Sequence, residues 1–146
     1  MRIEDICTRE AISIPPTATL IEAAETMRRC HVGALVVCDD ARVPIGLLTD
    51  RDIVVSAIAV GLAIESPRVG DVMTRPVLTC SMSDQLFDAI ATMRRNGVRR
   101  LPVVDEHGML AGIVSVQDIW GAVASQLGTL GDASTQAQIR EEHRRA

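Results

Sequence analysis

The chain repeats itself at an offset of 66 residues. The segment Thr26–Arg29 recurs as Thr92–Arg95, and 16 of the 49 aligned pairs between residues 5–53 and 71–119 are identical without a gap. A repeat of this length indicates one supersecondary unit that is used twice, because each copy alone is too small to bury its apolar face. We therefore expect the two copies to pack against each other in one fold.

Each copy has the pattern of a β-α-β-β-α unit. Apolar residues have helical spacing in both copies, at Leu20, Ala23, Ala24 and Met27 and again at Leu86, Ala89, Ile90 and Met93. Thr17 or Thr19 is expected to cap the first of these helices and Ser83 the second. Pairs of short apolar runs then predict β-hairpins, at 34–38 with 44–48 and at 101–104 with 109–114. Short extended segments precede these helices at 12–14 and 77–80, and further helices are expected at about 50–60 and 116–127.

The predicted fold class is α+β, with the first repeat at 3–60 and the second at 71–127. Residues 61–70 have the composition of a linker, with Glu65-Ser66-Pro67 near its centre. Residues 128–146 form a polar tail outside the repeat. For this tail a frayed segment, a helix that forms on a partner, and disorder all remain open.

Composition excludes several classes of function. With 15 basic and 19 acidic residues the formal net charge is -4, so the chain has no bulk attraction for nucleic acid or for an anionic membrane surface. No uncharged apolar run approaches the roughly 20 residues of a spanning helix. The start of the chain, Met1-Arg2-Ile3-Glu4-Asp5, lacks the apolar stretch of a signal peptide, which predicts a cytoplasmic location.

No catalytic or metal-binding constellation is evident. The four cysteines Cys7, Cys30, Cys38 and Cys80 form no C-x-x-C pair and are expected to be structural. The histidines are scattered, and the chain has no lysine, no nucleophile motif and no dinucleotide or Walker-type loop. We therefore predict a protein that is not an enzyme and needs no catalytic cofactor or metal.

The strand-to-helix junctions carry the same G-x-x-[ST]-x-x-D motif twice, at Gly46–Asp52 and Gly112–Asp118. One interpretation is a capping box, in which the hydroxyl and the carboxylate only satisfy the helix N-terminus. The other is a ligand site, in which the helix N-terminus attracts a phosphate and the carboxylate accepts the hydroxyls of a ribose. On one copy alone the capping box is the favoured interpretation, but the repeated glycine adds weight to the ligand interpretation, because a ligand that approaches the backbone closely requires it. The residues alone then support the two interpretations about equally.

The two junctions are not equivalent in charge. Arg99-Arg100 precedes the second hairpin, whereas Gly33-Ala34 stands at the same place in the first copy. Paired guanidinium groups beside a strand are suited to hold a phosphate, although solvated surface arginines are the alternative. We therefore expect any two ligand sites on this chain to differ in affinity.

The doubled unit, the strand Val-Arg-Arg-Leu-Pro-Val-Val-Asp and the two junctions resemble a tandem pair of CBS domains, the regulatory module named after cystathionine β-synthase. The resemblance covers about residues 3–122 and implies that the copies pack through their sheets about a pseudo-twofold axis. It also implies two clefts that take adenosine nucleotides as regulatory ligands. Carried onto this sequence, the first cleft comprises Thr8, Ile12, Val32, Gly33, Arg100, Ser115 and Asp118. The second comprises Thr49, Arg51, Asp52, Thr74, Val77, Val98 and Arg99, with Arg51 in place of the missing cation.

The resemblance further implies a stand-alone module that forms disc-shaped homodimers, as small bacterial members of the family do, and regulates a partner that the sequence does not identify. Apolar residues of the second helices are candidates for this interface, namely Ile53, Val54, Ile58, Ile119, Trp120 and Val123. The alternative is that these side chains complete the core of the monomer. An alternative function is a protein-docking module without a ligand, in which both junction motifs are only helix caps.

Overall fold

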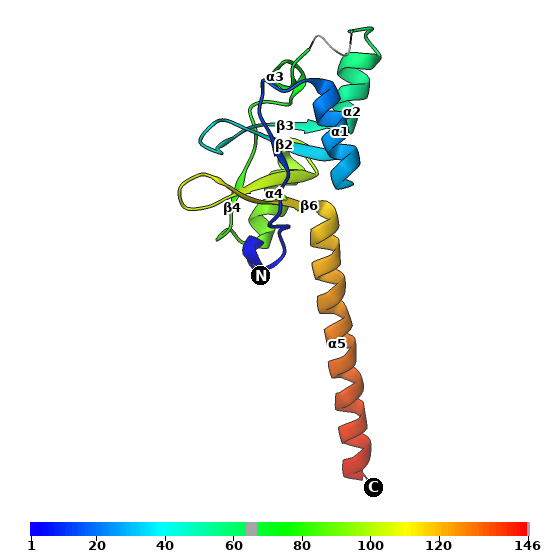
Figure 1. Ribbon diagram of the computed structural model, residues 1–146. Coiled ribbons are helices and arrows are strands. Elements are labelled where there is room, and N and C mark those ends of the chain that lie inside the picture. Colours follow the sequence, from blue (N-terminus) through cyan, green and yellow to red (C-terminus); the bar gives the residue numbers. More distant parts are fainter. Residues whose placement is uncertain (64–66, 146) are drawn as a thin grey trace.

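The computed structural model describes residues 1–63 and 67–145 and contains two three-stranded sheets flanked by helices (Figure 1). The first repeat contains η1 (Ile3–Asp5), β1 (Ser13–Ile14), α1 (Leu20–Cys30), β2 (Ala34–Cys38), β3 (Pro44–Thr49), α2 (Asp50–Ile53) and the π-helical turn η2 (Val54–Ile58). The second contains α3 (Val69–Val72), β4 (Cys80–Ser81), α4 (Leu86–Asn96), β5 (Arg100–Val104), β6 (Leu110–Ser115) and α5 (Val116–Arg145).

The two sheets have the same topology. In each, a short first strand runs parallel to the second, and the second pairs with the third as an antiparallel hairpin. Both hairpins shift register at equivalent places, between Val37 and Cys38 and between Val103 and Val104. The predicted α+β fold of two β-α-β-β-α repeats is confirmed.

Three apolar clusters form the interior. One lies between the first sheet and α1 and centres on Leu20, Leu35 and Leu48, and an equivalent one in the second repeat centres on Leu101 and Val114. A third cluster joins the two sheets and contains Val36, Cys38, Leu110, Ala11, Leu47 and Ile113. This third cluster explains why β2 is buried on both faces, since one face packs on α1 and the other on the second sheet.

The repeats exchange their first turns. Ile3 in η1 is fully buried in the core of the second repeat, and Val69 in α3 is fully buried in the core of the first. The backbone N–H of Ile3 donates to the Asp84 carbonyl at 3.0 Å, and the N–H of Val69 donates to the Ala18 carbonyl at 2.8 Å. These two hydrogen bonds are related by the 66-residue offset, so the exchange is symmetric.

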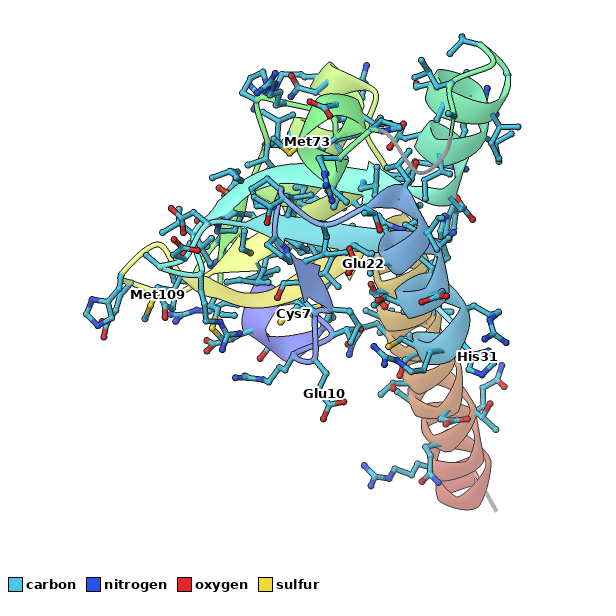
Figure 2. All side chains as sticks on the ribbon, turned by 45° about the horizontal axis from the view of Figure 1, so that its top comes forward. Cys7, Glu10, Glu22, His31, Met73 and Met109 are labelled. Carbon is cyan, nitrogen blue, oxygen red and sulfur yellow. The ribbon has the colours of Figure 1, made fainter. Side chains whose placement is uncertain are left out.

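The exchanged segments then cross the edge of the opposite sheet. Thr8 bridges to Ile113 in β6, and Thr74 bridges to Leu47 in β3. Figure 2 shows Met73, which follows α3 and precedes the second crossing, above the stacked sheets in that view, and Cys7 toward their lower edge. Each repeat therefore depends on a segment of the other for both its core and its sheet edge.

One of the predicted helix caps is correct and the other is wrong. Thr19 caps α1 in a capping box with Glu22, and hydrogen bonds from the Thr19 backbone N–H and hydroxyl hold the pKa of the Glu22 carboxyl below its ordinary value. In the second repeat the N-cap is Gln85, which makes no side-chain cap, and not Ser83. Asp84 instead accepts a hydrogen bond from the Ser81 backbone N–H, so the carboxylate closes the preceding turn.

The segments outside the repeats differ in their structure. The predicted linker 61–70 includes residues 64–66, which lie outside the described residues, and α3 begins at Val69 inside its predicted bounds. In the predicted tail, α5 continues as one helix to Arg145 and projects away from the sheets (Figure 1), while residue 146 lies outside the description. No helix in the described part of the chain is both long and apolar enough to cross a membrane.

Candidate functional site

We call the segment from the first turn of each repeat to its first strand the lead-in of that repeat. A cavity of about 260 Å³ lies where the lead-in of the first repeat meets the β5–β6 hairpin of the second. All seven residues predicted for the first cleft line it, namely Thr8, Ile12, Val32, Gly33, Arg100, Ser115 and Asp118. Four further residues, Glu10, Ala11, Ala34 and Ile113, complete the wall. Glu10 and Ala11 follow the crossing at Thr8 and belong to neither junction motif, so the sequence analysis did not identify them.

A second cavity of about 290 Å³ lies at the pseudo-symmetric place. Three of its predicted residues, Thr74, Val77 and Val98, line it together with Leu47, Pro76, Leu78, Asn96, Arg100 and Pro102. The other four predicted residues do not line this cavity. Thr49 and Asp52 form the cap of α2, Arg51 is exposed on that helix, and Arg99 lines a groove between α4 and α5.

Arg51 and Arg99 are therefore not brought to the second cavity, whose cationic side chain is Arg100. The sequence analysis assigned Arg100 to the first cleft and did not predict that it also lines the second. Arg99 directly precedes β5 and lines the groove between α4 and α5, whereas Arg100 begins the strand and lines the cavity. Both cavities lie close to the lower end of the size range of small-molecule pockets, which is about 300–1,000 Å³.

Both junction motifs form complete capping boxes. At α2 the Asp52 backbone N–H donates to Thr49 Oγ1 at 3.1 Å, and Asp52 Oδ2 accepts from the Thr49 backbone N–H at 2.8 Å. At α5 Asp118 Oδ2 accepts from the Ser115 backbone N–H at 2.7 Å and from Ser115 Oγ at 2.6 Å. Within the described residues, Asp118 Oδ1 has no hydrogen-bond partner, so one carboxylate oxygen in the first cavity stays available.

The junction glycines have a structural cause that the sequence analysis missed. A Cβ at Gly112 would lie 2.8 Å from the backbone oxygen of Thr8, and a Cβ at Gly46 would meet the Met73 side chain. Both glycines thus make room for the exchanged lead-in of the other repeat. The argument that these glycines indicate a ligand near the backbone is therefore wrong, and the case for a ligand depends on the cavities alone.

Arg100 is placed and charged to receive an anion. It is the first residue of β5, it pairs with Ser115 of β6 in the sheet ladder, and it is half-buried. Among the described residues no carboxylate forms an ion pair with its guanidinium. A half-buried guanidinium without a protein partner is a strong donor for a phosphate or carboxylate of a ligand.

Cys7, Cys38 and Cys80 are not activated for nucleophilic chemistry. Burial raises the pKa of the Cys80 thiol to about 12 and also raises the pKa of the Cys38 and Cys7 thiols. A thiol with a raised pKa carries little thiolate, which is the reactive form. Across residues 1–63 and 67–145, no group of three or more His, Cys, Asp and Glu side chains is arranged to hold a metal ion.

Two of the larger hollows outside the clefts lie along the helices. One, of about 890 Å³, follows the outer face of α1 and includes His31, which ends that helix in a left-handed conformation and is labelled in Figure 2. The other, of about 630 Å³, is an apolar groove between α4 and α5 beside Trp120. Neither hollow contains a junction motif.

These observations define an α+β module with two pseudo-symmetric clefts between its repeats. The family model of the CBS domain matches residues 3–57 and again residues 69–119. The chain belongs to the CBS domain family, and the resemblance inferred from the repeat is confirmed. The second match begins at the residue where α3 begins.

Relatives and solved structures agree with this assignment. An uncharacterised protein of Methanopyrus kandleri is 35% identical over 80% of this chain, and the chain spans 60% of that relative. Hypoxic response protein 1 of Mycobacterium tuberculosis is 34% identical over 79% of this chain and 80% of its own length. Its crystal structure, with two coordinated zinc ions, has a TM-score of 0.73 and covers 82% of this chain and 96% of that one.

A third comparison bears on the fold alone. A crystal structure of a CBS domain pair in complex with 5′-methylthioadenosine and S-adenosyl-L-methionine has a TM-score of 0.76. That chain is 23% identical, and the match covers 86% of this chain and 98% of that one. The ligands are those of that protein.

Proposed function

We propose that the chain is a non-catalytic sensor that binds an adenosine-containing nucleotide in the clefts between its repeats and reports it to a protein partner. The observation that carries the proposal is the first cavity, where an available carboxylate oxygen of Asp118 and the unpaired guanidinium of Arg100 line the same wall. These two groups match the two polar parts of a nucleotide. A cytoplasmic location remains a prediction from the sequence.

Each group has a distinct role in this proposal. Asp118 Oδ1 accepts hydrogen bonds from the ribose hydroxyls while Oδ2 keeps its place in the cap. Arg100 donates to the phosphate, and the Ser115 end of β6 lies beside it. The apolar side chains of Ile12 and Val32, with Gly33 in the segment between α1 and β2, enclose the base, since pockets of this kind combine apolar walls with a few polar groups.

In this proposal the second cleft binds a nucleotide more weakly than the first. Its wall is mostly apolar around Val77, Val98 and Thr74, and within the described part of the chain no carboxylate lines it to hold a ribose. Thr49, Arg51, Asp52 and Arg99, which lie away from this cavity, have no ligand role in the proposal. The two clefts therefore differ in affinity.

Replacing Asp118 with alanine is expected to remove most of the nucleotide binding. A thermal-shift panel of AMP, ADP, ATP, S-adenosylmethionine and NAD measures this. A ligand at about 100 times its Kd adds about 2.7 kcal/mol to the wild type, which raises Tm by roughly 5–10 °C for a chain of this size. The matched control is Asp52→Ala, which loses the equivalent capping box at a residue outside both cavities.

The two variants separate capping from binding. Each loses a capping box worth about 1 kcal/mol, so their unliganded Tm values should fall by similar amounts. A ligand shift that survives in Asp52→Ala and disappears in Asp118→Ala supports the proposal. Equal shifts in both variants return Asp118 to capping alone, and no shift with any ligand leaves the protein-docking module as the better function.

We further propose that the chain forms a homodimer through α2, η2 and α5. These elements run along one edge of the molecule (Figure 1) and expose Val54, Ile58 and Trp120, with Trp120 70% exposed. An exposed tryptophan beside an apolar groove is typical of an interface anchor. Of the other candidates, Ile53 and Ile119 are buried in the two cores and Val123 packs against the second, so these three serve the monomer.

Replacing Trp120 with glutamate is expected to convert a dimer into a monomer. A charge placed in an apolar interface is left without water or a partner, which opposes association. Light scattering after size exclusion measures the mass against the 15.7 kDa of one chain. The control is Phe87→Glu, because Phe87 is equally aromatic and 79% exposed but lies on α4. A wild type that is monomeric, or a dimer that survives Trp120→Glu, contradicts this interface.

A further inference from the structure

Arg100 lines both clefts. Among the residues that the structure describes, it alone belongs to the walls of both the 260 Å³ and the 290 Å³ cavity. In the described residues its guanidinium has no ion pair and no hydrogen bond to another side chain, so nothing in the protein fixes it toward either side. A flexible side chain at the boundary between two cavities can reach into one or the other.

The pseudo-twofold relation makes this cation unique. The equivalent of Arg100 in the first repeat is Ala34, which is the first residue of β2 and pairs with Thr49 as Arg100 pairs with Ser115. Ala34 lines the first cavity only, because its methyl group is too short to reach further. Two symmetric positions thus border the clefts, and one of them has a positive charge.

The other charged residues also differ between the two cavities. Besides Arg100, the first cavity has the carboxylates Glu10 and Asp118 on its wall, whereas no other charged residue among those described in residues 1–63 and 67–145 lines the second. In Figure 2 the Glu10 side chain points away from the ribbon, on the segment between η1 and β1. A phosphate in either cleft therefore has Arg100 as its available cation.

We propose that the two clefts compete for Arg100, so that a phosphate-bearing nucleotide in one cleft weakens the binding of a second in the other. This inference rests on the proposed nucleotide binding and adds its regulation. A guanidinium that binds one phosphate is held in a fixed geometry, and the phosphate neutralises its positive charge. The second phosphate then meets a neutralised arginine and a nearby anion, whereas an uncharged nucleoside meets no such penalty.

Calorimetric titration with AMP and with adenosine tests this competition. In the wild type, the ratio between the two AMP affinities should exceed the ratio between the two adenosine affinities by at least about tenfold, which is the size of one charge-assisted hydrogen bond. Arg100→Ala should weaken the tighter AMP site roughly tenfold to a hundredfold and change adenosine binding less than about threefold. Arg99→Ala is the matched control, since this arginine is adjacent in sequence and lines neither cleft.

Ala34→Arg supplies the gain-of-function arm. A second cation at the symmetric position should tighten the weaker AMP site by about tenfold and leave the weaker adenosine site within about threefold of its wild-type affinity. Two AMP sites of equal affinity in the wild type, or an unchanged tight site in Arg100→Ala, overturn the competition while leaving nucleotide binding in place. No binding of either AMP or adenosine to the wild type overturns the proposed function, and the competition with it.

Discussion

Replacing Ile3 with alanine is expected to lower the free energy of unfolding by about 2–5 kcal/mol, which is the usual cost of truncating a fully buried isoleucine. Although Ile3 stands almost at the start of the chain, its side chain is fully buried in the core of the second repeat. Its carbonyl also accepts a hydrogen bond from the Cys7 backbone N–H at 2.9 Å. The substitution would therefore open a cavity in the core of the second repeat. It would also loosen the segment that runs from Ile3 to the bridge between Thr8 and Ile113 of β6.

The measurement is denaturant unfolding followed by two probes. Far-ultraviolet circular dichroism reports both repeats, and the single tryptophan, Trp120 on α5, reports the second. Because the repeats exchange their first turns, we expect the two transitions to coincide in the wild type and in the variant. The matched control is Val69→Ala, which opens the equivalent cavity in the first core with a smaller loss because valine is smaller.

Two results would contradict the exchanged arrangement. A loss below about 1 kcal/mol in Ile3→Ala would mean that the first turn is not part of a core. A tryptophan transition that separates from the circular dichroism transition in the wild type would mean that the repeats unfold as independent units.

The exchange itself could not be predicted from the sequence. An internal offset of 66 residues aligns Ile3 with Val69, but the alignment is the same whether each turn packs on its own repeat or on the other. The helices and hairpins were predictable because the apolar spacing within one copy determines them. Which copy a short lead-in joins depends on tertiary packing, and no local pattern records that choice.

The candidate site was predictable for one cleft and less so for the other. The seven residues of the first cleft line one cavity, and the cap residues of the first repeat lie away from the second. Symmetry relates the backbone positions but not the length of the side chains. Arg100 reaches both clefts and Ala34 reaches one, so two equivalent positions create two unequal sites.

The junction glycines show how one residue can satisfy two interpretations. Their repetition favours a close approach to the backbone, which is correct, but the approaching group is the chain itself. The sequence alone could not separate the two, because a ligand and a crossing strand need the same missing Cβ. The exchange of lead-ins therefore explains the glycines, the bridges at Thr8 and Thr74, and part of the wall of each cavity.

Replacing Gly112 with alanine is expected to destabilise the fold by about 2–3 kcal/mol, in the upper part of the range for an overpacked interior. The added methyl would lie 2.8 Å from the Thr8 backbone oxygen, which accepts a hydrogen bond from the Ile113 backbone N–H at 2.9 Å and cannot withdraw without breaking it. Gly112 does not have a left-handed backbone, so the cost comes from space alone.

The matched control is Gly46→Ala at the symmetric junction. Its methyl would meet the side chain of Met73, which is flexible and can rotate away, so the expected loss is about 1 kcal/mol or less. Denaturant midpoints of the two variants measure the difference. Gly112→Ala should also weaken nucleotide binding, since Thr8 lines the first cavity and must move. Equal losses in the two variants would mean that the lead-in is not held against β6 as the Thr8–Ile113 bridge requires.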